Sequence, residues 1–235
     1  NDLLLDKIIS TFNLKHEEHI AMFGIAGSMG GLKALKQNLC HIASSHLIAD
    51  NEDYNFPFLK DELDQIPAVV NFCRREQGLL IQKGNPKKIG SITDLGKPGI
   101  KLVNQQLTTG TRKLFDKLLK ESGLKGESID GYNTLVSKHM DVGIEILNGR
   151  ADAGPGIKPV ANILGLDFIS LAWERFDLLV SKERFFDQGI QLFLSLLKGK
   201  VIQSTAKAYG GYDLSMSGKM IYPEPAPEQE PGSII

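Results

Sequence analysis

Apolar positions along the chain follow two periods, one typical of helices and one typical of strands. Residues 2–12 carry leucine, isoleucine and phenylalanine at helical spacing, with Asn1 or Asp2 placed to cap the helix. This arrangement predicts the second half of a strand–turn–helix unit, with its strand ahead of Asn1. Further helices are predicted over 32–39, 113–119, 140–147, 159–164, 188–197 and 202–209, and a single helical turn over 92–95.

Shorter apolar runs bounded by turn residues predict strands. They cover 20–26, 40–48, 69–82, 99–103, 151–157, 167–171 and 176–180. Strands that alternate with helices predict an α/β fold with a parallel, doubly wound sheet. From Pro223 onward the chain is rich in proline and glutamate and has no apolar period, which predicts a flexible tail over 223–235.

Three predicted turns that lead into a helix carry hydroxyl or imidazole side chains. They are Gly27-Ser28-Met29-Gly30-Gly31, Thr109-Gly110-Thr111-Arg112 and Ser137-Lys138-His139. The first N–H groups of a helix lack partners and the helix dipole is positive there, so each turn favours an anion. Ligands of α/β sheets bind at the carboxyl ends of strands, so we expect the three turns to converge on one anion. Thr108 or Thr109 could equally serve only as a helix cap.

Composition narrows the function further. The 235 residues, 42% of them hydrophobic, can form one large domain or two small ones. With 27 basic and 28 acidic residues the net charge is −1, which argues against direct nucleic-acid binding by this chain. Cys40 and Cys73 lie in apolar runs and are expected to be small buried hydrophobes. No run of 18 apolar residues predicts a membrane span.

Several short motifs resemble metal-binding or nucleotide-binding sites in residue type, but their spacing does not match such sites. His16-Glu17-Glu18-His19 lacks the spacing of a zinc helix, and 50–53 lacks the alternation of a calcium loop. Residues 84–88 lack the Gly-Lys-Ser/Thr ending of a phosphate-binding loop. His41 and His46 flank a predicted strand and are expected to be structural, so no cofactor or metal is expected.

A serine hydrolase is an alternative. Ala26-Gly27-Ser28-Met29-Gly30 is one residue away from the Gly-x-Ser-x-Gly nucleophile turn. His139 would then act as the base, oriented by Asp130 or Asp141. Trp173 with Phe176 is expected to pack between lobes, or alternatively to stack on an aromatic ligand.

Taken in order, several segments resemble the periplasmic-binding-protein-like domain of bacterial and archaeal regulators. That family is similar to type II solute-binding proteins for molybdate and tungstate, and its members are often fused to a helix-turn-helix or a molybdopterin-synthesis domain. The resemblance covers most of the chain, from Asn1 to about Gly218. The segments are 27–35, 46–47 with 54–58, 75–79, 103–104 with 110–112, 149–154, 165–168 and 174–178.

The resemblance implies a non-catalytic, two-lobed α/β domain with parallel-rich sheets and an oxyanion in the cleft between the lobes. The crossing strands would lie near 78–83 and 168–178. One lobe would comprise 1–80 and 178–222, and the other, inserted lobe 81–177. By this resemblance we expect a cytoplasmic location and leave open whether a DNA-binding domain lies ahead of Asn1, whereas a signal peptide there would place the protein in the periplasm or outside the cell.

The same resemblance implies the residues that hold the ligand, most plausibly molybdate or tungstate. Leu107-Thr108-Thr109 departs from the family's usual Gly-Ser, which leaves the anion open. Arg112 could neutralise the anion, could point to an acidic neighbour, or could hold the carboxylate of a small organic ligand, which is the second alternative. The expected ligand-binding residues are Ser28, Met29, Thr109, Gly110, Thr111, Arg112, Ser137, Lys138 and His139.

Overall fold

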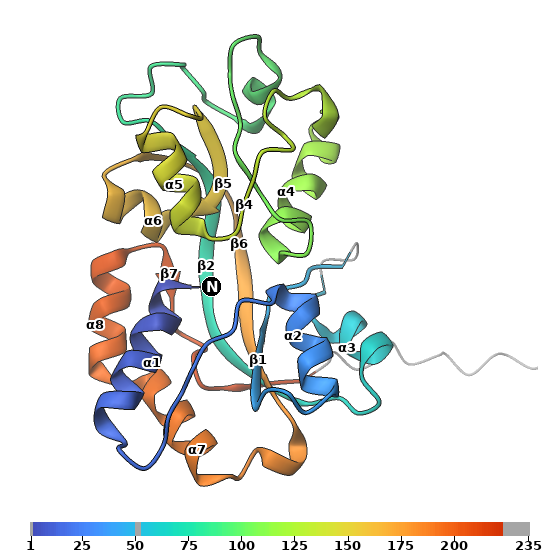
Figure 1. Ribbon diagram of the computed structural model, residues 1–235, viewed down its shortest axis with the longest axis vertical. Coiled ribbons are helices and arrows are strands. Elements are labelled where there is room, and N and C mark those ends of the chain that lie inside the picture. Colours follow the sequence, from blue (N-terminus) through green and yellow to red (C-terminus); the bar gives the residue numbers. More distant parts are fainter. Residues whose placement is uncertain (1, 50–52, 223–235) are drawn as a thin grey trace, which may run out of the picture.

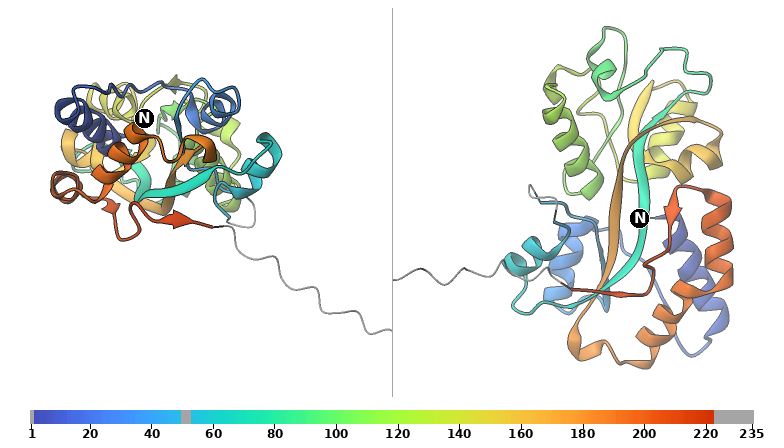
Figure 2. Two further views of the ribbon diagram at one scale, coloured as in Figure 1. Left: turned by 90° about the horizontal axis from the view of Figure 1, so that it is seen from below. Right: turned by 180° about the vertical axis from the view of Figure 1, so that it is seen from behind.

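Two lobes lie one above the other in the computed structural model, which describes residues 2–49 and 53–222 (Figure 1). Two long strands run through both lobes, β2 (Ala68–Ile81) and β6 (Asp167–Val180). They lie side by side when the molecule is turned (Figure 2) and are paired antiparallel from Ala68↔Val180 to Ile81↔Asp167. The long strand predicted over 69–82 is confirmed, whereas the strands predicted over 167–171 and 176–180 form one continuous strand.

The main sheet has the order β1-β6-β2-β5, and β7 and β8 also pair with β2. All of these pairs are antiparallel. Parallel pairing among the described residues is limited to β3 with β4 and to a bridge between Leu102 and Ala153. The parallel-rich sheet was therefore a wrong prediction. Alternation of strands and helices does not reveal that the chain leaves one lobe on β2 and returns on β6, in the opposite direction. The shorter strands are β1 (Ile42–Ser45), β3 (Asn104–Gln105), β4 (Leu135–Val136), β5 (Ala153–Ile157), β7 (Tyr212–Asp213) and β8 (Met220–Ile221).

Helices cover the sheet in both lobes (Figure 1). The lower lobe carries α1 (Leu3–Lys15), α2 (Gly27–Lys36), α3 (Phe56–Glu62), α7 (Gln188–Ser195) and α8 (Lys200–Tyr209). The upper lobe carries α4 (Gly110–Glu121), α5 (His139–Leu147) and α6 (Lys158–Leu164). Single 3-10 turns are found at Ile92–Gly96, Gly126–Ser128, Lys182–Arg184 and Leu196–Lys198. All the predicted helices are confirmed in type, with ends that shift by a few residues. None of them, within the described part of the chain, has the length and apolar character needed to cross a bilayer.

Each lobe has its own buried apolar clusters. The clusters of the lower lobe include residues of β2 up to Cys73 and of β6 from Phe176 onward. Those of the upper lobe include β2 from Leu79 and reach β6 only up to Leu171. The middle of the two crossing strands belongs to neither core, and this stretch carries the polar side chains of the site described below. Cys73 is buried in the lower core and Cys40 is half-buried, both as free thiols.

The strand predicted over 20–26 is not present. This segment has no regular secondary structure, and the side chains of Ile20 and Met22 are 80% and 88% exposed. A strand needs a neighbour to accept its backbone hydrogen bonds, and the nearest strand, β1, is paired within the described residues only with β6. Sequence pattern alone could not reveal that this partner would be absent. Residues 99–103 likewise contribute only the bridge at Leu102.

Candidate ligand-binding site between the lobes

A buried charged network occupies the middle of the crossing strands. Arg75 of β2, 1% exposed, donates from Nε to Oε1 of Glu174 on β6 and from Nη1 to Oδ2 of Asp2, 2.8 Å away. Its guanidinium also lies 4.3 Å from the centroid of the Phe176 ring. A buried charge without a partner would be strongly destabilising, and here the cation has two carboxylates and an aromatic face.

Asp2 connects this network to the start of α1. Its Oδ1 accepts from the backbone N–H of Leu4 at 2.9 Å and of Leu5 at 3.1 Å, which confirms Asp2 as the predicted helix cap. Its Oδ2 accepts from Arg75 and from the Tyr212 hydroxyl, 3.1 Å away. The carboxylate therefore fixes the first turn of α1 against β2.

Glu174 extends the network into both lobes. Its Oε1 also accepts from Nε2 of Gln77 at 2.6 Å, and the same Gln77 amide donates to the Thr111 hydroxyl at 3.0 Å. Its Oε2 lies 2.9 Å from Nδ1 of His46. Thr111 belongs to α4 of the upper lobe and His46 follows β1 of the lower lobe, so the hydrogen bonds of one carboxylate hold groups from both.

The lobes are in direct contact around this network. A Cβ at Gly110 would lie 2.4 Å from Nδ1 of His46, so only glycine fits at the start of α4 in this arrangement. A Cβ at Gly27, whose φ is +67°, would lie 2.9 Å from the carbonyl oxygen of Thr108. The first turns of α2 and α4 therefore meet, and the lobes are closed on one another.

The Ser28 hydroxyl lies at this meeting point. Its oxygen accepts from the backbone N–H of His46 at 3.3 Å, and the side chain is buried. The Thr111 hydroxyl likewise accepts a hydrogen bond, from the side-chain amide of Gln77. A hydroxyl that accepts one hydrogen bond still has its own proton to donate. Ser28 and Thr111 therefore both present an O–H donor.

His139 supplies a third donor from the first turn of α5. Its Nδ1 lies 2.8 Å from Nε2 of Gln105, a donor, so Nδ1 accepts and the proton is assigned to Nε2. Burial lowers the pKa of His139 well below its usual value, and the charge of Arg75 adds to this effect. His139 is accordingly neutral, with one N–H left to donate.

His46 and Glu174, two further titratable groups of the centre, both have lowered pKa values but for different reasons. Burial lowers the pKa of His46, and the negative charge of Glu174 only partly compensates. Burial alone would raise the pKa of Glu174, but the charge of Arg75 and the hydrogen bonds from His46 and Gln77 outweigh it and leave the pKa below its ordinary value. Glu174 is therefore ionised over the whole physiological range.

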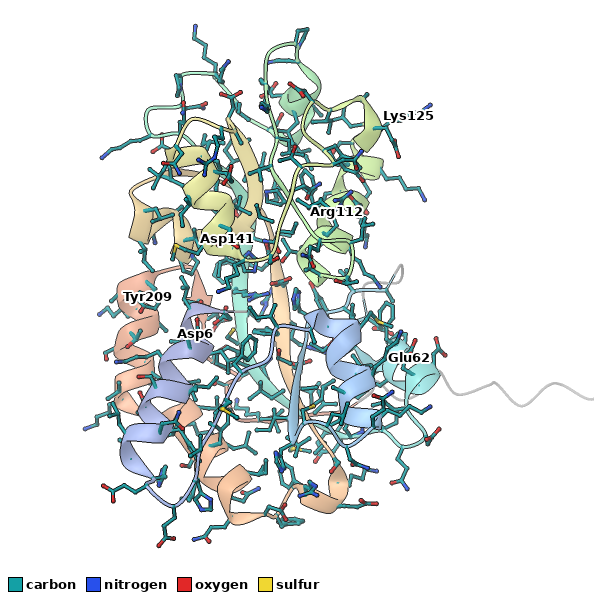
Figure 3. All side chains as sticks on the ribbon, viewed as in Figure 1. Asp6, Glu62, Arg112, Lys125, Asp141 and Tyr209 are labelled. Carbon is teal, nitrogen blue, oxygen red and sulfur yellow. The ribbon has the colours of Figure 1, made fainter. Side chains whose placement is uncertain are left out.

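Four helices begin at this region: Asp2 is the N-cap of α1, and Ser28, Thr111 and His139 lie in the first turns of α2, α4 and α5. Figure 3 labels Arg112 and Asp141, which mark the first turns of α4 and α5 at the lower edge of the upper lobe. The positive ends of these helix dipoles add to the donors already described. The region is suited to an acceptor-rich group.

Five of the nine expected site residues have other roles: Met29, Thr109, Ser137 and Lys138, described here, and Arg112, described next. Thr109 caps α4, because its hydroxyl accepts from the Arg112 N–H and donates to the Gln106 carbonyl. The backbone N–H of Lys138 donates to Asp141 in the first turn of α5. Exposed Ser137 accepts from Nε2 of Gln106 at 2.9 Å, and Met29 packs against the lower core.

Arg112 is buried but faces its own lobe. Its Nε donates to both carboxylate oxygens of Asp116, at 2.8 and 2.9 Å, and its guanidinium lies 4.1 Å from the centroid of the Tyr132 ring. Nη1 donates to the carbonyl oxygen of Gln105. Of the three uses expected for Arg112, the structure shows the one in which it points to an acidic neighbour.

The side chains that link the lobes were not among the expected site residues. His46 was expected to be structural, and Gln77, Arg75 and Glu174 were given no role, yet they connect Ser28 to Thr111. A signal was present in the sequence. All four lie in segments that carry the family resemblance, and a polar pentapeptide in an otherwise apolar strand predicts a buried network.

The serine hydrolase arrangement is not formed by the residues expected to form it. Nδ1 of His139 faces Gln105 rather than a carboxylate, and the Asp141 carboxylate accepts from the Lys138 N–H. Asp130 is exposed and contributes its backbone carbonyl to the Leu102 N–H. Neither aspartate orients His139, whose Nδ1 is instead paired with the Gln105 amide.

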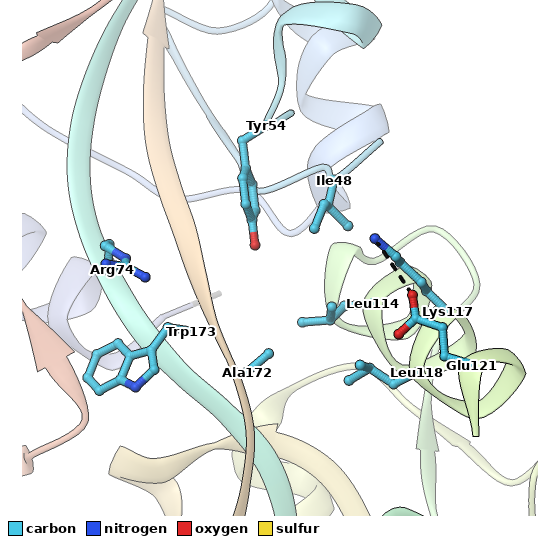
Figure 4. Close-up of a pocket in the computed structure, with 9 residues that line it drawn as sticks. All are labelled: Ile48, Tyr54, Arg74, Leu114, Lys117, Leu118, Glu121, Ala172 and Trp173. Atoms are coloured by element: carbon cyan, nitrogen blue, oxygen red, sulfur yellow. Dashed lines mark ion pairs between the residues drawn. The ribbon is translucent and has the colours of Figure 1, made fainter. Parts of the chain in front are cut away.

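A smaller groove of about 310 Å³ lies on the other side of the crossing strands (Figure 4). Arg74 and Trp173, the neighbours in sequence of Arg75 and Glu174, line it together with Tyr54 and Lys117. Trp173 is 41% exposed, whereas Phe176 is in the lower core. The expectation that both aromatics pack between the lobes is therefore wrong for Phe176, whereas Trp173 lines a groove that contains residues of both lobes, such as Tyr54 and Leu114. Across the described residues, no three histidine, cysteine or acidic side chains are grouped as metal ligands.

Comparisons with known proteins agree with this architecture. Residues 9–198 match the model of the PBP superfamily domain. The chain is 32% identical over 197 residues to the uncharacterized protein YvgK of Bacillus subtilis (strain 168), which covers 83% of this chain and 63% of that protein. The chain thus spans less than two thirds of that relative's length.

Solved structures share the fold at low sequence identity. One is described as a phosphate ABC transporter substrate-binding protein with bound phosphate from Clostridium perfringens, with a TM-score of 0.67, 13% identity and coverage of 89% of this chain and 93% of that chain. Another is described as the substrate-binding domain of a molybdenum ABC transporter from Clostridium difficile, with a TM-score of 0.55, 15% identity and the same coverage. The two lobes, the paired crossing strands and the family match together show that this chain belongs to the PBP (periplasmic-binding-protein-like) superfamily.

Proposed function

We propose that this chain binds a small tetrahedral oxyanion, molybdate or tungstate, between its lobes and without catalysis. The observation that carries the proposal is the direction of the hydroxyl hydrogen bonds. Ser28 and Thr111 both accept from the protein, so each has a proton to give to a ligand. His139 adds a neutral N–H donor.

The charges of the network support binding by neutral donors. Arg75 is held by Asp2 and Glu174, and these carboxylates are themselves occupied by Tyr212, Gln77 and His46. No charged side chain of the network is left to neutralise the ligand. Hydroxyls, the imidazole N–H and helix N-termini can satisfy an oxyanion without a full countercharge.

Donors alone also favour molybdate and tungstate over phosphate. At neutral pH, phosphate is partly protonated and its hydroxyl needs an acceptor, whereas molybdate and tungstate offer only acceptors. The three side-chain groups identified here are all donors. One structural neighbour is described as binding phosphate and another as belonging to a molybdenum transporter, so both anions belong in the test.

Binding of a ligand between the lobes would be coupled to the closure of the lobes on one another. We assign residues 1–80 with 178–222 to one lobe and 81–177 to the other; the flexible tail predicted over 223–235 lies outside the described residues. A ligand that contacts both lobes shifts the equilibrium toward the closed state by its differential affinity. In a cytoplasmic regulator with a DNA-binding domain this closure would be the signal, and in an exported transport protein it would allow docking.

Isothermal titration calorimetry with molybdate, tungstate, sulfate and phosphate tests the proposal. Binding of molybdate or tungstate is expected, with Ser28→Ala and Thr111→Val each weakening it by about 10- to 100-fold, the cost of a hydrogen bond to a charged group. Ser195→Ala, which alters an exposed hydroxyl bonded only to Leu192, is the matched control and should not change affinity. If none of the four anions binds, or if both variants bind as tightly as the parent, the proposal is wrong.

A further inference from the structure

Gln105 lies directly beside His139 in the upper lobe. It belongs to β3, is 2% exposed, and its Nε2 is 2.8 Å from Nδ1 of His139. The same nitrogen also donates to the backbone carbonyl of Pro155 in β5, 3.3 Å away. A side-chain amide nitrogen carries two protons. One of them can therefore go to the carbonyl and the other to the imidazole.

The Pro155 carbonyl determines which way the amide of Gln105 points. A carbonyl oxygen only accepts hydrogen bonds, so it needs the nitrogen end of the amide. If the amide were turned over, its oxygen would face the carbonyl oxygen of Pro155, and two acceptors would be in contact. The backbone of β5 is itself held in the sheet, where Pro155 is paired with Leu79 of β2. The orientation of the amide is thus set by the backbone of this chain.

This orientation determines what His139 presents to a ligand. A neutral imidazole has one N–H and one acceptor nitrogen, and because Nδ1 accepts from Gln105, the proton lies on Nε2. No hydrogen bond joins Nε2 to another of the described residues. The imidazole is also subject to the charges of Arg75 and Glu174 on the crossing strands, so it lies beside the interlobe network. Its N–H is free to serve a ligand there.

We infer that Gln105 is a specificity-determining residue of the anion site, because it keeps His139 as an N–H donor and so disfavours an oxyanion that carries a proton. The inference rests on the proposed function. The hydroxyls of Ser28 and Thr111 can rotate, whereas the imidazole can become an acceptor only if its proton moves to Nδ1. The amide of Gln105 prevents that transfer, since it already donates to Nδ1.

Sulfate and phosphate reveal this effect because they are tetrahedral anions of similar size. Near pH 8, sulfate has only acceptor oxygens, whereas most phosphate carries one proton that needs an acceptor. The ratio of their dissociation constants therefore reports the cost of the proton rather than the fit of the anion. Molybdate also has only acceptors and serves as the competing ligand when either anion binds weakly.

Gln105→Met removes both amide protons and keeps the length of the side chain. Nδ1 can then hold the imidazole proton, and Nε2 can accept from a protonated phosphate oxygen. The ratio of the phosphate Kd to the sulfate Kd should fall about fivefold or more, the cost of an unsatisfied polar group. The ratio of the sulfate Kd to the molybdate Kd should stay within about threefold, because neither anion carries a proton.

Gln106→Met is the matched control, because it makes the same change at the next residue. Gln106 is exposed and its Nε2 donates to the Ser137 hydroxyl at 2.9 Å, away from His139. Both ratios should be the same in this variant as in the parent. An equal fall of the phosphate-to-sulfate ratio in both variants would overturn the inference, and so would an unchanged ratio in Gln105→Met.

The tautomer of His139 can be observed without any anion, by two-bond ¹H–¹⁵N correlation NMR of the ¹⁵N-labelled parent near pH 8. The signals of His139 are those missing from His139→Gln. The parent should have an unprotonated Nδ1 and a protonated Nε2, and Gln105→Met should lose this single state. A proton on Nδ1 in the parent would overturn the inference whether or not an anion binds.

This measurement uses the parent protein, so it decides the tautomer even if the methionine variant does not fold. It also separates the inference from the proposed function. If the tautomer is as assigned but none of the anions binds to the parent, the proposed function is wrong, and the role of Gln105 in specificity is overturned with it. If anions bind but the tautomer is the other one, only the role of Gln105 is wrong.

Discussion

Gly110→Ala is the most direct perturbation of the contact between the lobes. The added Cβ would lie 2.4 Å from Nδ1 and 2.5 Å from Cε1 of His46, about 1 Å closer than van der Waals contact permits. The imidazole can give way only by losing its 2.9 Å hydrogen bond to Glu174 or by the lobes moving apart. Overpacking of this kind costs about 1–3 kcal/mol.

The cost should appear in binding rather than in folding. In the ligand-free protein the lobes can separate, and alanine at a helix start is itself up to about 1 kcal/mol more favourable than glycine. In the closed, ligand-bound state the overlap between the added Cβ and the His46 ring cannot be relieved by separation of the lobes. We therefore expect the affinity for molybdate to fall about 5- to 150-fold, with a change in Tm of less than about 4 °C.

Calorimetry gives the affinity, and small-angle scattering gives the radius of gyration, which should increase in Gly110→Ala without ligand. Gly189→Ala is the matched control, because it also lies in the first turn of a helix and its Cβ would be 3.4 Å from its nearest neighbour, an ordinary contact. Unchanged affinity and radius in Gly110→Ala would refute the claim that α4 closes against His46.

Three further substitutions separate structural from ligand-binding roles. Arg75→Leu leaves two buried carboxylates without their cation and should reduce the free energy of unfolding in urea by about 3–5 kcal/mol. His139→Gln should make the protein less sensitive to acid. Burial lowers the pKa of His139, so as the pH falls below about 6.5 the unfolded state binds this proton and the folded state does not, which destabilises the parent protein. Between pH 7 and pH 5 the free energy of unfolding should therefore fall by up to about 2 kcal/mol less in the variant than in the parent. Arg112→Ala should lower Tm by removing the contacts to Asp116 and Tyr132, while affinity for molybdate stays within about threefold.

Each of these outcomes has a contrary result. A stable Arg75→Leu variant would mean that the buried network is dispensable, and an unchanged pH profile in His139→Gln would mean that this imidazole has the same pKa in the folded and unfolded states. For Arg112→Ala the control is Arg150→Ala, which removes an exposed ion pair to Glu145 and should leave Tm nearly unchanged. A large loss of affinity in Arg112→Ala at constant Tm would instead favour a carboxylate ligand.

Most of the secondary structure could be predicted from the local pattern of apolar and polar residues. Helical spacing identified the helices, and the extended pattern over 69–82, although interrupted by the polar residues 74–78, identified β2, because both features depend on neighbours in sequence. Strand direction depends on partners that are distant in sequence, so the antiparallel sheet was not predictable in the same way. The absence of the strand at 20–26 has the same origin, since a strand pattern cannot show whether a neighbour is present.

The candidate site was predicted in part. Turn chemistry identified Ser28, Gly110, Thr111 and His139, which the structure brings to the contact between the lobes. It did not separate them from Thr109, whose hydroxyl is consumed by its own helix. The groups that join the lobes, above all Glu174, form hydrogen bonds with residues that are distant in sequence. Gln77 and Glu174, for example, are 97 positions apart. Such pairs are visible only once the strands are placed side by side.

The ladder between β2 and β6 slips in register twice, between Asn71 and Cys73 and again between Gln77 and Gly78. Each slip adds an unpaired residue and loosens the ribbon locally. The stretch between them carries Arg75 and Glu174, whose ion pair ties the two strands together across the ladder. The connection between the lobes is therefore a stiff central segment flanked by two pliable ones. Rotation of one lobe would be absorbed at the slips, and the charged centre would keep its internal geometry whether the molecule is open or shut.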